Sequence, residues 1–171
     1  MDARVTAIAQ FQLTHRIVDM VLGGLSPEIF NARPPGKITS IASIYAHMVL
    51  SEDWLVQELA QGKAKLYDSG GWAAKTGGPA IESAELAPGW ADTLVLDLAR
   101  FKPYAEATYA ATEAFLQDAS EAALARVVDS PLGDKIPAFD LIANLGVFHA
   151  AEHTGEMAAL KGVMGEQGLP F

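Results

Sequence analysis

Two histidines four residues apart near the C-terminus, His149 and His153, place the strongest constraint on how this chain can fold. In a helix this spacing puts both imidazoles on one face. Burying such ionisable groups without partners is costly, so something must satisfy them, and a metal ion is the leading candidate. The face they share has the four- and three-residue steps of a helix packed in a bundle: Ile142, Gly146, His149, His153, Glu156, Leu160 and Val163.

The rest of the chain can supply a helical core. We expect residues 1–171 to form one domain, because half of the residues are hydrophobic and the chain is long enough to bury a sizeable core. The absence of cysteine excludes disulfides and thiolate ligands and fits a cytoplasmic protein. A net charge of −9 disfavours phosphate backbones and anionic membranes. We therefore expect neither a nucleic-acid nor a membrane partner.

The spacing of hydrophobic residues predicts four long helices, and therefore an all-α four-helix bundle. A short helical turn and a brief extended piece are expected before the last helix. The segment 62–89 is rich in glycine and proline but contains Trp72, which predicts a partly ordered loop over one end of the bundle, or else a tolerated surface insertion. The expected helices cover residues 3–24, residues 39 or 40 to 61, residues 90 or 97 to 119 (across Pro103), and residues 137–164.

The two remaining histidines lie on other predicted helices. His15 is on the apolar face of the first helix, where it is either a core histidine satisfied by a polar neighbour or part of the same site. His47 would be an ordinary boundary residue by itself, but it becomes a candidate ligand beside the pair on the last helix. The pair also matches the H-x-x-E-H protease pattern. We reject that assignment because only 18 residues follow His153, too few for the distant glutamate ligand.

Several short motifs resemble the DinB/YfiT-like family. They are the run from Pro35 to Ile41, Ala46-His47-Met48 on the second helix, the run from Phe148 to Glu156 on the fourth, and the ending from Leu160 to Pro170. The resemblance implies an up-down-down-up bundle with a long crossover between the second and third helices. It also implies a divalent ion (zinc, nickel or iron) bound by His47, His149 and His153. Some relatives use a low-molecular-weight thiol, and many form homodimers. The resemblance therefore implies a homodimer here, and a low-molecular-weight thiol as a possible partner.

Three neutral imidazoles would leave a coordination position open, which is typical of a catalytic rather than a structural site. Glu156 lies one turn beyond His153 and is the candidate catalytic residue: it could hold a water molecule, act as general base or orient a histidine, unless it is a surface salt-bridge residue. Glu52 is a weaker alternative, because it is about 140° around the helix from His47. Trp54 and Trp72 are expected to line the mouth of a substrate pocket.

Three functions follow from these observations. The first is a metal-dependent enzyme acting on a small molecule, either a hydrolase or a thiol-dependent S-transferase. The second is a non-catalytic metal-binding bundle that senses or sequesters the ion. The third is a structural helical dimer whose polar face holds only water.

Overall fold

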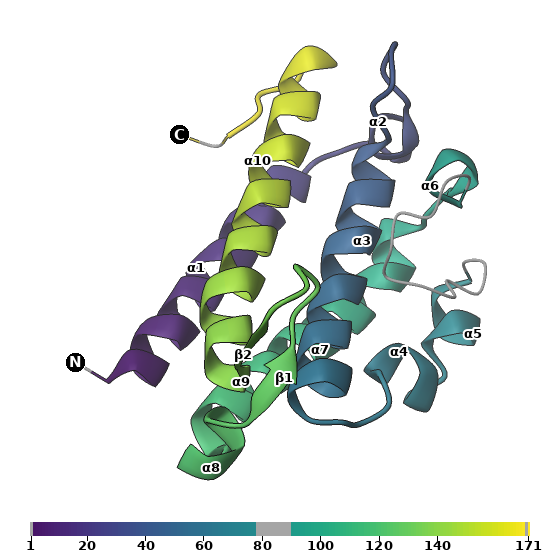
Figure 1. Cartoon of the computed structure of the whole chain (residues 1–171). Coiled ribbons are helices and arrows are strands. Elements are labelled where there is room, and N and C mark those ends of the chain that lie inside the picture. Colours follow the sequence, from purple (N-terminus) through teal and green to yellow (C-terminus); the bar gives the residue numbers. More distant parts are fainter. Residues whose placement is uncertain (1, 78–89, 170) are drawn as a thin grey trace.

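The computed structural model describes residues 2–77, 90–169 and 171, and its four long helices form an up-down-down-up bundle (Figure 1). The long helices are α1 (Ala3–Leu22), α3 (Ile41–Asp53), α7 (Leu98–Asp118) and α10 (Val147–Val163). Helix α1 packs against α7 and α10, and α3 packs against the same two helices, so that α1 and α3 lie diagonally opposite each other. This arrangement confirms the predicted fold class.

Side-chain caps set the beginnings of three of these helices. Asp2 accepts a hydrogen bond from the backbone at the start of α1, and Ser40 does the same for α3. Asp97 accepts from two backbone N–H groups, so α7 begins at Leu98 and continues through Pro103 as one helix. Of the two predicted starting points for this helix, Asp97 is the one observed.

The two helices that carry the candidate ligands both contain a π-helical stretch. The segment η1 (Trp54–Ala60) continues directly from α3, and η2 (Leu141–Gly146) leads from the short α9 (Ala138–Asp140) into α10. Helical structure therefore spans the ranges predicted for the second and fourth helices. A π-helical turn holds more residues than an α-helical one, so each stretch changes which side chains face the bundle beyond the histidines.

The crossover between α3 and α7 is more helical than expected. Its described part contains α4 (Leu66–Ser69), α5 (Trp72–Thr76) and α6 (Trp90–Thr93); residues 78–89 of the predicted loop lie outside the described residues. Helix α4 packs against α3 and α7, and α5 packs against α4 and α7. The buried Asp53 carboxylate holds α4 in place by accepting hydrogen bonds from the Leu66 and Tyr67 amides, each at 2.9 Å.

Short elements complete the chain. The predicted helical turn is α8 (Glu121–Leu124), and the extended piece is a hairpin of β1 (Val127–Asp129) and β2 (Lys135–Pro137), with Val128 opposite Ile136. Another short helix, α2 (Pro27–Asn31), follows α1. Figure 1 shows the loop of the hairpin reaching the region between α3 and α10. The hairpin therefore reaches the helices that carry the candidate ligands.

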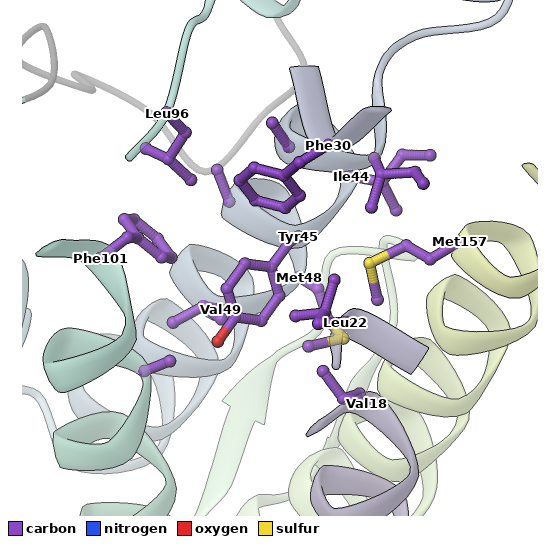
Figure 2. Packing of buried hydrophobic residues seen from close by; sticks show 14 of the residues in the cluster. Val18, Leu22, Phe30, Ile44, Tyr45, Met48, Val49, Leu96, Phe101 and Met157 are labelled. Atoms are coloured by element: carbon purple, nitrogen blue, oxygen red, sulfur yellow. The ribbon is translucent and has the colours of Figure 1, made fainter. Parts of the chain in front are cut away.

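One of the two hydrophobic core clusters among the described residues is built around aromatic and sulfur-containing side chains. Tyr45 of α3 is buried and makes edge contacts with Phe30 of α2 and Phe101 of α7, as Figure 2 shows. Met48 and Met157 fill the space toward α1 and α10. Across the part of the chain that the structure describes, no helix combines the length and apolar character needed to cross a membrane.

Lys161 is a buried cation that completes the end of α1. Its Nζ donates hydrogen bonds to the carbonyls of Val21 at 2.8 Å and Gly23 at 3.4 Å, where the helix leaves backbone acceptors unpaired. Replacing Lys161 with methionine is expected to lower the free energy of unfolding by about 2 kcal/mol, as for other hydrogen bonds to charged groups. Urea denaturation measures this loss. Lys135→Met, at an exposed lysine, is the control and should change stability by less than about 0.5 kcal/mol.

Candidate metal centre

Three histidine side chains from two helices converge on one point. His47 comes from α3, and His149 and His153 come from successive turns of α10. The Nε2 atom of His149 lies 3.1 Å from Nε2 of His47 and 3.2 Å from Nε2 of His153. The same nitrogen of each ring therefore faces a common centre, and the three histidines form a group that could hold a metal ion.

The spacing of these nitrogens matches the geometry of a bound divalent ion. Imidazole nitrogens lie about 2.0–2.1 Å from zinc, which separates two of them by about 3.3 Å in a tetrahedral site and about 2.9 Å in an octahedral one. The observed separations of 3.1 and 3.2 Å lie between these limits. The donor atoms of the three residues and these two separations therefore fit a metal ion.

Glu156 fixes the orientation of one of the three rings. Its Oε2 atom lies 2.8 Å from Nδ1 of His153, on the side of the ring opposite the shared centre. A proton held on Nδ1 by this carboxylate leaves the lone pair of Nε2 free for a metal, which is how many metal-binding histidines are oriented. Of the roles that the sequence left open for Glu156, this contact favours orienting a histidine.

The environment of His149 keeps its imidazole neutral. Burial, followed by the nearby His153 and His47, lowers the pKa of His149 to about 3. Only a neutral imidazole can donate a nitrogen lone pair to a metal. His149 is therefore ready to act as a ligand throughout the physiological pH range.

The lowered pKa predicts how the stability of the metal-free protein depends on pH. Between pH 6.5, the ordinary pKa of histidine, and about pH 3, the pKa of His149 in the folded protein, His149 is protonated in the unfolded chain but not in the folded one. Stability is therefore expected to fall as the pH falls through this range, by at most about 1.4 kcal/mol per pH unit. Urea denaturation with a chelator present, from about pH 7 to pH 4.5, measures the slope. A slope unchanged in His149→Phe would contradict this assignment.

The contact between Glu156 and His153 makes a second prediction. Glu156→Gln replaces the charged acceptor with a neutral amide, and metal affinity is expected to fall by about 10- to 100-fold. Competition with a chromophoric chelator measures the dissociation constant. The matched control is Glu152→Gln, an exposed position on the same helix. Equal affinities in the two variants would show that Glu156 does not support the ligand.

Comparison with known proteins identifies the family. A sequence model of the DinB superfamily matches residues 10–157. The chain belongs to the DinB superfamily. Its fold is similar to that of a conserved protein from Enterococcus faecalis, whose crystal structure aligns with a TM-score of 0.78 at 17% sequence identity, covering 97% of this chain and 99% of the other. No curated protein matches the chain.

His15 and Glu52 do not join the metal centre of this DinB protein. Nε2 of His15 lies 2.9 Å from Oε2 of Glu52, and Oε1 of Glu52 accepts a hydrogen bond from Thr112 at 2.6 Å. The ring of His15 also stacks on Tyr109, with a centroid distance of 3.5 Å. His15 is thus the core histidine with a polar neighbour that the sequence favoured. Glu52 points away from His47, as expected.

The two tryptophans expected at the pocket mouth lie in different places. Trp54 lines a cavity of about 200 Å³ whose walls include His47 and His149. Trp72 does not line this cavity; it packs on Tyr104, with a ring-centroid distance of 5.7 Å. The structure thus brings Trp54, but not Trp72, to the cavity beside the histidines.

Residues that the sequence did not single out form the rest of this cavity. Ser51 and Leu145 lie four residues from His47 and His149, so helical spacing alone could have revealed them. The hairpin loop contributes two more side chains, and no local pattern places that loop beside the histidines. The additional lining residues are Ser51, Leu55, Pro131, Leu132 and Leu145.

Proposed function

We propose that the protein is a metal-dependent enzyme in which His47, His149 and His153 hold zinc, nickel or iron beside a small-molecule substrate. The reaction is a hydrolysis or the transfer of a low-molecular-weight thiol. The observation that carries the proposal is the convergence of three Nε2 atoms at 3.1 and 3.2 Å next to a cavity. Three protein ligands with an accessible side are typical of catalytic sites, whereas structural sites are closed by four.

The residues of the site have different roles in the proposed reaction. A divalent ion at this position would act as a Lewis acid toward a substrate oxygen or thiol. Three neutral imidazoles would hold the ion without cancelling its positive charge. Glu156 is a positioning residue that holds the His153 ring, and Trp54 forms part of the cavity wall beside the site.

The second candidate is a metal-binding bundle without catalytic activity, which senses or sequesters the ion. The hydrogen bond between Glu156 and His153 favours it, because a carboxylate engaged in this way is a weaker proton acceptor for a substrate. Both candidates require the same three ligands. They differ in whether the bound ion turns over a substrate.

Screening the reconstituted protein separates the two candidates. Protein loaded separately with zinc, nickel and iron is tested against esters, amides and pairs of a low-molecular-weight thiol with an electrophile. The enzyme proposal expects turnover that is lost in His47→Ala and after chelation. Stoichiometric metal without turnover of any of these classes would contradict the enzyme proposal and support the non-catalytic bundle.

A further inference from the structure

We propose that the cavity beside His47 and His149 binds one small apolar substituent of the substrate, a branched alkyl group or a single aromatic ring. This inference deepens the proposed function, because it names the class of molecule that would react at the metal. The carbon skeleton next to the reacting group would enter the cavity, while the polar end of the molecule would face the imidazoles.

The cavity lies one helical turn from the convergent nitrogens. Ser51 is four residues after His47 on α3, and Leu145 is four residues before His149 at the end of η2. The imidazoles of His47 and His149 form part of the wall, so a molecule in the cavity contacts two of the three candidate ligands. The cavity and the metal centre therefore form one continuous site.

The chemistry of the lining selects apolar groups. Apart from the two histidines, Ser51 is the single polar residue among those that line the cavity, and none of them is charged. The remaining walls are an indole, a proline ring and three leucine side chains: Trp54, Pro131, Leu55, Leu132 and Leu145. A charged or strongly polar substituent would lose its hydration here without finding partners, whereas an apolar one is favoured.

The size of the cavity limits what can enter. Sites for whole drug-sized ligands typically enclose about 300–1,000 Å³, so about 200 Å³ accommodates only part of such a molecule. An engineered apolar cavity of about 150 Å³ in another protein binds benzene. A single ring or a branched alkyl group therefore fits.

Leu132 at the tip of the hairpin indicates where the substituent enters. Its side chain lines the cavity although 78% of its surface is exposed to solvent. An apolar side chain in this position gains burial when an apolar group lies beneath it. The hairpin loop thus forms the exposed part of the cavity wall, and residues of α3, η1, η2 and α10 form the rest.

Hydroxamic acids test this assignment because they bind metal ions through the same end group while the rest of the molecule varies. We would measure binding of acetohydroxamic and benzohydroxamic acid to the zinc-loaded protein by isothermal titration calorimetry. Each buried methylene group contributes about fourfold in affinity, so benzohydroxamic acid is expected to bind at least about tenfold more tightly than acetohydroxamic acid.

Two variants show whether the cavity causes this preference. Leu145→Trp fills the cavity, and Leu132→Asp places a charge at its exposed outer wall without disturbing the core. Both should reduce the ratio between the phenyl and methyl dissociation constants to about one, whereas the control Val163→Trp, at an exposed position at the far end of α10, should preserve it. A ratio near one in the wild type, or a ratio that both cavity variants preserve, would overturn the proposal.

A metal-free measurement separates this inference from the proposed function. Fluorobenzene has no metal-binding group, and its binding to the chelated protein is followed by ¹⁹F NMR. If fluorobenzene binds saturably to the wild type and Leu145→Trp removes this binding, the apolar site is supported. If in addition no metal binds, only the proposed function has failed. Absence of fluorobenzene binding together with a flat hydroxamate series overturns the apolar site while leaving the metal centre intact.

Discussion

Replacing His149 with alanine is expected to lower the affinity for a divalent ion by more than about 100-fold, beyond the effect of altering a residue that only supports a ligand. His149 is the residue whose Nε2 lies close to both other ligand nitrogens, at 3.1 and 3.2 Å. Its loss leaves two imidazoles from different helices. Competition with a chromophoric chelator measures the change for zinc and nickel.

The same variant should separate metal binding from folding. Burial and two neighbouring histidines keep His149 uncharged near neutral pH, so the metal-free variant is expected to lose only the packing contacts of the ring. In the wild type, an ion at about 100 times its dissociation constant raises the free energy of unfolding by about 2.7 kcal/mol. In His149→Ala, this stabilisation by added metal should vanish. Glu152→Ala on the same helix is the control. Wild-type metal stabilisation in His149→Ala would exclude this histidine as a ligand.

Replacing Glu52 with alanine is expected to reduce the free energy of unfolding by about 3–5 kcal/mol, a large part of the total for a domain of this size. The carboxylate is buried where α1, α3 and α7 meet, and it contacts both His15 and Thr112. Removing it leaves two buried polar groups without this partner and opens a cavity. Urea denaturation at neutral pH measures the loss.

A second pair of variants shows that the loss comes from the broken pair. Glu52→Gln keeps the size and one oxygen acceptor, so it should cost less than Glu52→Ala. The double variant His15→Phe/Glu52→Leu replaces both partners with apolar groups and should recover much of the stability. A double variant less stable than Glu52→Ala would mean that the polar pair itself, rather than its disruption, determines the effect. Metal affinity should stay unchanged in Glu52→Gln, because Glu52 lies outside the metal centre.

The sequence predicted the parts of the fold that depend on helical periodicity. The spacing of His149 and His153 within an apolar face predicted a buried pair on one helix, and the structure places it there with His47 opposite. Family membership follows from a match over residues 10–157 and supports the same expectation. These features could be predicted because each depends on residues that are close in the sequence or on a short motif.

The parts that escaped prediction depend on contacts between distant segments. The π-helical stretches η1 and η2 change the register of side chains without a sequence signal that could reveal them. Trp72 was expected to line the pocket mouth with Trp54, but it packs on Tyr104 and does not line the cavity beside the histidines. Leu132 reaches the cavity because the hairpin folds back toward the helices, a contact between segments that the spacing of residues does not encode.

X-ray absorption spectroscopy of the zinc-reconstituted protein, together with metal analysis, tests the three-histidine centre most directly. The structure predicts one ion per chain, with three imidazole nitrogens at about 2.0–2.1 Å and a further light-atom ligand in the open position. His47→Ala should lose this ordered shell. An ion surrounded only by oxygen ligands, or less than a tenth of an ion per chain after reconstitution, would contradict the assignment.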